Sequence, residues 1–462
     1  MSSIRLGVVP VKRGGTSLEV ALEQKELILE KIDTIKPDNV ELVNINDLTD
    51  SGILYELEKM GQVENKLKTK DIDGLFMPHC DFGTEEIVGR LAKKMGVPFL
   101  LWGPRDDAPD PGTGKRSRDN QCGIFASSKV LQRYKVPFSY IINSSIDSKT
   151  FARGFKKFNQ VVSVVKNFNN LRIAQISTRP KPFLSVMINE NELLERFGIE
   201  VVPISLLDIV KEVKEMVSGQ TSSIKKEVED IKSRIDCSQM KNKDIEKITA
   251  LKQVILRKIN QHNCNAAALE CWSLFPDALG VLPCFVVSEL TDMKIPVACE
   301  TDIHGAVTSI LLQAATFEEK PTFFADLTIR HPDNDNAELL WHCGPFPYSI
   351  KAPQENAGLV DGKGQWQLKT GDITLARFDA IDGEYSLFAG EARGIEGPKT
   401  EGTYLWFEVD DWKKWEEKFI FGPYIHHIVG IHGRYAAVLQ ESCKYIPGLK
   451  ADSINQINKS LS

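Results

Sequence analysis

The sequence predicts an α/β protein made of two parallel-sheet units and a C-terminal β unit. Strand and helix patterns alternate from residue 4 to residue 102 and again from residue 171 to residue 343, which is typical of doubly wound parallel sheets. From residue 348 to residue 406 helical periodicity is almost absent and glycines are frequent, which is typical of a small barrel or sandwich. The expected domains are therefore 1–168, 169–345 and 346–462.

The elements of the first unit are short apolar strands, each followed by an amphipathic segment. We expect strands at 4–11, 39–45, 74–78 and 97–102, and helices at 18–35, 84–95 and 149–168.

The second unit repeats this alternation with apolar strands and a long charged helical region. We expect strands at 171–177, 200–204, 264–269, 295–299 and 323–325, a mostly helical stretch at 205–260, and a crossover helix at 305–315. Charge runs such as KKEVEDIKSR in the helical stretch predict a solvated helix face.

The composition is that of an ordinary globular protein: 462 residues, 42% hydrophobic, 26% charged and a net charge of −6. The absence of a basic block argues against nucleic acid or an anionic membrane as a partner. No stretch reaches the roughly 20 apolar residues that cross a membrane, and the start of the chain resembles no signal peptide. We therefore expect a cytoplasmic protein. The nine cysteines contain no CxxC pair, which fits reduced thiols rather than structural zinc.

Acidic residues follow three of the predicted strands of the second unit: Glu270, Glu300 and Asp326. If residues 295–326 form a parallel βαβ unit, Glu300 and Asp326 lie at one edge of the sheet, where open α/β sheets usually bind ligands. Two neighbouring carboxylates repel unless a shared proton or a cation neutralises them. The pattern thus indicates a divalent metal site. The alternative is that Glu300 caps the following helix and Asp326 begins a solvated turn.

Four of the eight histidines stand where they could complete such a site: His304, His342 and the pair His426 and His427. His342 follows a predicted strand and could face the same edge as Asp326. Adjacent strand residues point to opposite faces, so at most one histidine of the pair is expected at a given site. Carboxylates with one or two imidazoles suit Mn²⁺ or Mg²⁺, and less specifically Co²⁺. The alternative for each histidine is a packed or surface residue.

The chain resembles the superfamily of L-fucose isomerase and L-arabinose isomerase in an ordered series of segments. These are the opening GVVPV strand with Arg13, then HCDFGTEE, LLWGPRD, ECW, ETDIHGA, FFAD, WHCG and HHIVGIHG. The resemblance implies two Rossmann-like doubly wound α/β domains followed by a C-terminal β-barrel domain. It also implies a homo-oligomer, hexameric or trimer-based.

The resemblance further implies that Glu300, Asp326 and His427 hold Mn²⁺, with Mg²⁺ or Co²⁺ as substitutes, and that the two carboxylates also move protons. In the arabinose enzymes a further histidine ligand has its nearest match in His342. A substrate-contacting arginine of the family matches Arg13. We expect four more residues of the shared segments to contact the substrate: Trp102, Glu270, Trp272 and His304.

The function expected from these features is that of a metal-dependent aldose–ketose isomerase acting through a cis-enediol. The substrate is expected to be a monosaccharide such as a pentose or a 6-deoxyhexose. One alternative is an epimerase or lyase that uses the same enediolate. The other is a non-catalytic carbohydrate-binding protein, against which the clustered acids count.

Overall fold

The computed structural model describes residues 3–169, 171–219, 222–454 and 460–462. The chain divides into two compact units. The first consists of Met1–Lys166, Lys444–Ile446 and Ile457–Ser462, and the second of Asn167–Cys443 and Pro447–Gln456. The division into domains 1–168, 169–345 and 346–462 stays a prediction.

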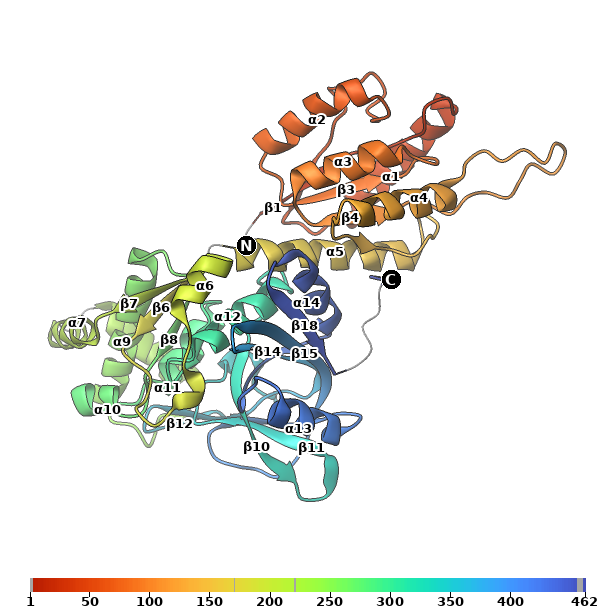
Figure 1. Ribbon diagram of the computed structural model, residues 1–462. Helices are drawn as coiled ribbons and strands as arrows, with labels where there is room; N and C mark the ends of the chain where they lie inside the picture. The colour runs from red at the N-terminus through yellow and green to blue at the C-terminus, as the bar shows by residue number, and fades with distance from the viewer. Residues whose placement is uncertain (1–2, 170, 220–221, 455–459) are drawn as a thin grey trace. The chain divides into compact units, whose positions relative to one another are not determined.

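The first unit is built on a five-stranded parallel sheet of order β2-β1-β3-β4-β5. Its elements are, in chain order, β1 (Ile4–Val8), α1 (Leu18–Ile35), β2 (Val40–Val43), α2 (Leu57–Thr69), β3 (Gly74–Pro78), α3 (Glu85–Met95), β4 (Phe99–Trp102), α4 (Asn120–Arg133), β5 (Ser139–Tyr140) and α5 (Lys149–Phe168). Helices α2, α3 and α4 lie together on one side of the sheet (Figure 1).

Local sequence explains where these helices begin and end. For example, α3 has Glu85 and Glu86 in its first turn, where the helix dipole favours negative charge. It ends at Gly96, whose φ of 65° is a left-handed conformation that glycine adopts readily. On the other side of the sheet, Phe151 of α5 stacks on Trp102 with ring centroids 3.9 Å apart.

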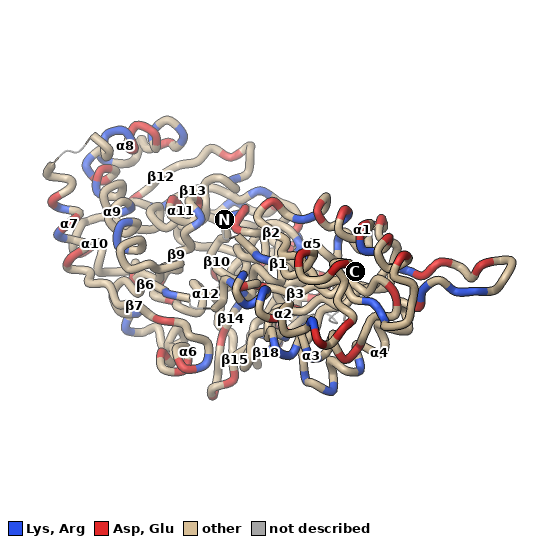
Figure 2. Tube along the Cα trace, turned by 90° about the horizontal axis from the view of Figure 1, so that it is seen from above, with Lys and Arg blue, Asp and Glu red and all other residues tan. Residues whose placement is uncertain are grey.

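The second unit begins with a four-stranded parallel sheet of order β7-β6-β8-β9. Its elements are β6 (Arg172–Ile176), a 3-10 turn at Leu184–Val186, α6 (Glu190–Phe197), β7 (Glu200–Ile204), α7 (Leu206–Ser218), α8 (Ser222–Arg234), α9 (Asn242–Gln261), β8 (Ala266–Leu269), α10 (Leu274–Leu279), α11 (Cys284–Asp292), β9 (Val297–Cys299) and α12 (Ile303–Ala314). Helix α8 carries charges of both signs (Figure 2), and most of its charged side chains are exposed, as expected for a solvated helix face.

The rest of the second unit is a nine-stranded mixed sheet of order β12-β13-β16-β11-β10-β17-β14-β15-β18. Its elements are β10 (Phe323–His331), β11 (Asn334–His342), a 3-10 turn at Tyr348–Ile350, β12 (Gly358–Val360), β13 (Lys363–Gln367), β14 (Gly371–Ile381), β15 (Glu384–Ile395), β16 (Thr403–Glu408), α13 (Trp412–Phe421), β17 (His427–His432), α14 (Ala436–Ser442), a 3-10 turn at Cys443–Tyr445 and β18 (Leu449–Ser453). Strand β16 pairs with β15 as well as with β11.

The structure confirms the parallel sheets and the β-rich C-terminal region, but the predicted parallel βαβ unit over residues 295–326 is wrong. Strand β9 belongs to the four-stranded parallel sheet, whereas β10 belongs to the mixed sheet and runs antiparallel to β11 and β17. Asp326 therefore lies inside a nine-residue strand and not at the end of a short one. Strand β17 pairs with the apolar start of β10, and the antiparallel pairing with β11 extends β10 beyond that start.

Within the described parts of the chain, each helix is too short or too polar to cross a lipid bilayer.

Candidate metal centre

Glu300 stands in a tight turn at the end of β9. Glu300 and Thr301 have φ values of 61° and 57°, a left-handed conformation that costs about 1–2 kcal/mol per non-glycine residue. Backbone hydrogen bonds from Thr301 to Leu269 and from Asp302 to Cys299 hold the turn. Strain of this kind is retained where the surroundings force a side chain into one position. Here the turn directs the carboxylate of Glu300 toward β17.

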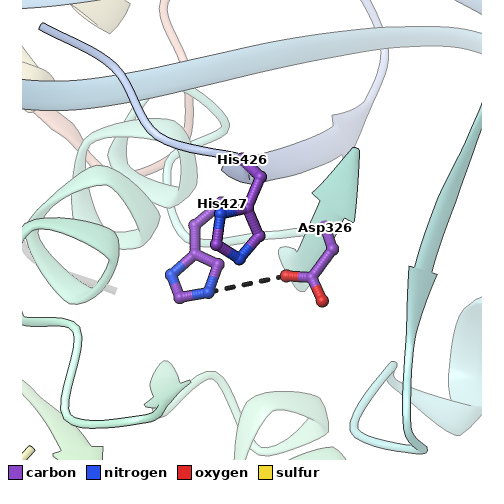
Figure 3. Close-up of side chains that lie close together, drawn as sticks. All are labelled: Asp326, His426 and His427. Atoms are coloured by element: carbon purple, nitrogen blue, oxygen red, sulfur yellow. Dashed lines mark ion pairs between the residues drawn. The ribbon is translucent and has the colours of Figure 1, made fainter. Parts of the chain in front are cut away.

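Asp326 and His427 face each other across neighbouring antiparallel strands, because β10 and β17 pair these two residues directly. Nε2 of His427 lies 3.6 Å from Oδ1 of Asp326 (Figure 3) and 2.9 Å from Oε2 of Glu300. The side chain of His427 is fully buried. One imidazole nitrogen thus lies close to both predicted carboxylates. The sequence did not predict that these two carboxylates would come from different sheets.

His426 also reaches this site. Among the described residues, Asp326, His426 and His427 are the group whose ligand atoms lie close enough to hold one ion, all within 4.8 Å of one another. Their side chains face one another in Figure 3. The expectation that only one histidine of the pair could face the site is therefore wrong. Side chains alternate only inside a strand, and His426 precedes the first residue of β17.

The unsatisfied atoms of the site fit a cation. Buried polar atoms normally find partners, yet three here have no partner other than one another among the described residues: Oε2 of Glu300, Oδ1 of Asp326 and Nε2 of His427. These atoms are two carboxylate oxygens and one imidazole nitrogen, a donor set that suits Mn²⁺ or Mg²⁺. The residues present can therefore hold the metal that the resemblance implies.

Neighbouring groups of opposite charge set the direction in which the pKa values of His427 and Glu300 are shifted. Burial lowers the pKa of His427, but hydrogen bonding to Asp302 and Glu300 outweighs it and raises the pKa to about 9. Burial raises the pKa of Glu300, but His427 outweighs it and the net pKa is lowered. Without a bound cation the positive charge of His427 therefore balances the ionised Glu300. A cation could take over this role if it replaced the proton on Nε2.

In His342 the ring nitrogen Nδ1 accepts a hydrogen bond from the backbone and does not face a carboxylate of the described residues. Its Nδ1 accepts the backbone N–H of Cys343 at 2.9 Å, while its Nε2 is buried and has no hydrogen-bond partner in the described chain. A neutral imidazole that accepts at Nδ1 carries its proton on Nε2. Burial lowers the pKa of His342, but the charge of Asp326 contributes to raising it to about 10. The two histidines therefore differ at Nδ1, which accepts a backbone N–H in His342 and faces the carboxylate of Asp302 in His427, so the geometry favours His427 over His342 as a ligand through Nε2.

Two aromatic side chains border the centre. The indole N–H of Trp272 donates to Oε1 of Glu300 at 2.7 Å. The ring of Phe183, carried by the loop after β6, contacts Trp272, His426 and His427 with centroid distances of 5.0, 5.7 and 5.7 Å. Trp272 is 47% exposed. The structure thus places Trp272 next to the carboxylate, as a substrate-contacting residue would require.

The other predicted residue of this segment, Glu270, has a local structural role. Its carboxylate accepts the backbone N–H groups of Trp272, Ser273 and Leu274 at 3.0–3.1 Å. Three accepted amides at the start of α10 occupy both of its oxygens. Glu270 therefore holds the turn that presents Trp272.

His304 lies on α12, buried, with its Nδ1 2.9 Å from Oδ1 of Asp379. Its ring packs on Phe378 and Tyr385, and its described partners do not include Glu300 or Asp326. A substrate contact by His304 stays a prediction.

Arg13 and Trp102 belong to the first unit. Arg13 is exposed, with its guanidinium carbon 4.5 Å from the centre of the Phe82 ring. Trp102 is fully buried in the core of that unit. Their roles in substrate binding stay predictions.

Sequence reasoning missed three charged residues behind the centre: Asp302, Arg377 and Asp379. Asp302 lies 2.9 Å from Nδ1 of His427 and forms an ion pair with Arg377, which also pairs with Asp379. Asp302 stands inside the ETDIHGA segment and could have been singled out as a helix cap. Arg377 and Asp379 lie 75 residues or more from Asp302 in an ordinary strand pattern, so no local signal marks them.

The fold and site therefore define an α/β protein with a candidate carboxylate–imidazole metal centre. Its similarity to known proteins indicates which kind of α/β protein it resembles. Residues 7–169 match the family model described as the fucose/sulfoquinovose isomerase N-terminal domain. These matches support a fucose isomerase-like protein, as its motifs predicted.

Several curated relatives are sulfoquinovose isomerases. The protein from Priestia megaterium (strain ATCC 12872 / QMB1551) is 25% identical over 85% of this chain and 89% of its own length. The protein from Alkalicoccus urumqiensis is 25% identical over 70% of this chain and 73% of its own length. Among solved structures, a periplasmic solute binding protein from Actinobacillus succinogenes 130z with bound D-allose covers 69% of this chain and 94% of its own. It shows 13% identity and a TM-score of 0.18, too low to support any argument.

Proposed function

We propose that this protein is a metal-dependent aldose–ketose isomerase that acts on a monosaccharide through a cis-enediol. The observation that carries the proposal is the approach of two carboxylates, Glu300 and Asp326, to the buried Nε2 of His427. The proposed ligands are Glu300, Asp326 and His427, with His426 as a fourth donor on the exposed side. The relatives, which are named as isomerases, support the reaction class.

The chemistry requires moving a proton between two neighbouring carbons of the sugar. A divalent cation in this centre would polarise the carbonyl group and stabilise the negative charge of the enediolate. Glu300 and Asp326 are the groups available to take the proton from C2 and to return it to C1. The lowered pKa of Glu300 keeps it ionised at neutral pH, as a base must be. Trp272 restrains its carboxylate through Oε1 and leaves Oε2 available.

We propose sulfoquinovose, a sulfonated hexose, as the first substrate to test, because the relatives carry its name. The pentose or 6-deoxyhexose expected from the motifs is the second class. Mn²⁺ is the proposed metal, since the donor set combines oxygen with imidazole.

Three larger features complete the proposal. The pairing of β15 with β16 supports closure of the C-terminal sheet into a barrel. The three-domain division remains as predicted above. The homo-oligomer, hexameric or trimer-based, rests on the family resemblance alone.

The test is an assay of chelator-stripped protein with a panel of sugars that includes sulfoquinovose, L-fucose and L-arabinose, with and without Mn²⁺. Glu300→Gln, which keeps an acceptor for Trp272, is assayed alongside. We expect interconversion of aldose and ketose that requires metal and is lost in the variant. Sugar binding without turnover would favour a binding protein, and a changed configuration or a cleaved bond would favour an epimerase or lyase.

A further inference from the structure

A buried chain of ion pairs lies behind His427. Oδ2 of Asp302 is 2.9 Å from Nδ1 of His427 and also accepts from Nη1 of Arg377, while Oδ1 is 3.2 Å from Nη2 of the same arginine. Nε of Arg377 donates to Oδ2 of Asp379 at 2.8 Å, and Oδ1 of Asp379 lies 2.9 Å from Nδ1 of His304. All five side chains are buried.

We propose that Asp302 is the positioning residue of the metal centre, because it holds the proton of His427 on Nδ1 and so presents Nε2 to the cation. Arg377 in turn holds the carboxylate of Asp302 in place. This inference rests on the metal centre of the proposed function and adds the residue that prepares its imidazole ligand.

The argument starts from the chemistry of the ring. A neutral imidazole has one N–H, and an ionised carboxylate only accepts hydrogen bonds. With Asp302 beside Nδ1, the proton stays on Nδ1 and the lone pair on Nε2 points toward Glu300 and Asp326. Carboxylate–histidine pairs of this kind orient metal ligands, and their loss typically lowers metal affinity about 10–100-fold.

The surroundings leave the Asp302 carboxylate one orientation. Its Oδ1 accepts the N–H of Gly305 at 2.9 Å and thereby caps α12. A Cβ atom at Gly305 would lie 2.9 Å from Oδ2 of Asp302, so the helix packs directly against this oxygen. The carboxylate is therefore fixed by the helix on one side and by Arg377 on another, and its remaining side faces Nδ1 of His427.

The test compares Asp302→Asn with Asp379→Asn as a matched control. Each change removes one carboxylate partner of Arg377 at a buried position, but only Asp302 touches His427. Asparagine is a good helix N-cap, so α12 keeps its start in the Asp302 variant. The amide can instead donate to Nδ1 and move the ring proton to Nε2.

Calorimetric titration of the metal-stripped proteins with Mn²⁺ gives the readout, which does not depend on turnover. We expect the Kd for Mn²⁺ to rise about 10–100-fold in Asp302→Asn and to stay near the wild-type value in Asp379→Asn. An unchanged Kd in Asp302→Asn, or an equal rise in both variants, would overturn the inference. Wild-type protein that binds no divalent metal would instead remove the centre itself and with it the proposed function.

A second measurement uses the wild-type chain and decides the question even if neither variant folds. NMR of ¹⁵N-histidine-labelled protein loaded with diamagnetic Mg²⁺ or Zn²⁺ reports which ring nitrogens carry protons. His427 is assigned by the signal that disappears in His427→Gln or, if that variant does not fold, by the signals that move on metal binding. We expect a protonated Nδ1 and an unprotonated Nε2. The reverse tautomer would contradict the role of Asp302.

Discussion

The indole nitrogen of Trp272 donates a hydrogen bond to Oε1 of Glu300 over 2.7 Å, while Oε2 of the same carboxylate lies 2.9 Å from Nε2 of His427. The two oxygens of Glu300 therefore have different tasks. Oε1 is restrained by a residue of the turn before α10, and Oε2 faces the site. This division sets the rotation of the carboxylate about its terminal bond.

We predict that Trp272→Phe lowers kcat/KM at saturating metal by about tenfold. The variant loses a hydrogen bond from a neutral donor to a charged acceptor. A hydrogen bond of this kind contributes about 1.5–3 kcal/mol, and a loss of 1.4 kcal/mol lowers a rate about tenfold. Trp406→Phe is the control, because its indole donates to the carbonyl of Pro398 instead. Equal losses in the two variants would show that the effect comes from the aromatic exchange and not from Glu300.

Asp326→Asn is expected to lose bound metal. Its Oδ1 faces Nε2 of His427, and a neutral amide is a much weaker ligand for a hard cation. Metal content per chain, measured after dialysis against Mn²⁺ and then buffer, checks this. Asp372→Asn, which removes an exposed ion-pair partner of Arg434, is expected to keep the wild-type content. Full metal content in Asp326→Asn would exclude Asp326 from the site.

Two glycines in helices of the first unit are expected to respond oppositely to alanine. A Cβ atom at Gly123 in α4 would lie 1.7 Å from the carbonyl oxygen of Phe82, whereas one at Gly61 in α2 meets nothing within 4 Å. Gly123→Ala should lower the free energy of unfolding by about 1–3 kcal/mol or more. Gly61→Ala should raise it by about 0.5–1 kcal/mol, because alanine restricts the unfolded chain and favours helix. Urea unfolding measures both, and destabilisation by Gly61→Ala would contradict the open position of that residue.

Stability should fall with acid because of His79. Burial lowers its pKa to about 4, whereas the unfolded chain has a histidine pKa of about 6.5. Above pH 6.5 both states are neutral at this residue and it has no effect. Below that pH the unfolded state takes up a proton first, so stability decreases between pH 6.5 and about 4, by about 2 kcal/mol at pH 5.

The check is the urea unfolding midpoint at pH 7 and pH 5 in the wild type and in His79→Asn. The variant loses the hydrogen bond between His79 and Ser127, so it is less stable at pH 7. Its midpoint should nevertheless fall less between the two pH values. An equally steep fall would assign the acid sensitivity to other groups, such as His432, whose pKa burial also lowers to about 4.

Much of the fold could be predicted from local patterns. The helix expected at 149–168 matches α5, and the apolar run that ends before Glu300 is β9. Such elements follow from periodicity and from caps, which act over a few residues. The error at β10 has a different origin, because the sheet that this strand joins depends on its pairing with β17, about a hundred residues later in the chain.

The sequence by itself predicted the class of fold and singled out Glu300, Asp326 and one histidine of the pair as candidates for a single site. It did so because strand and helix periods and short motifs are local properties. Only the tertiary structure decided that β9 and β10 belong to different sheets, that His426 faces the same site as His427, and that Asp302 and Arg377 support the ring. These relationships depend on strand pairing and on buried charges that need partners far along the chain, and no local pattern encodes such partners.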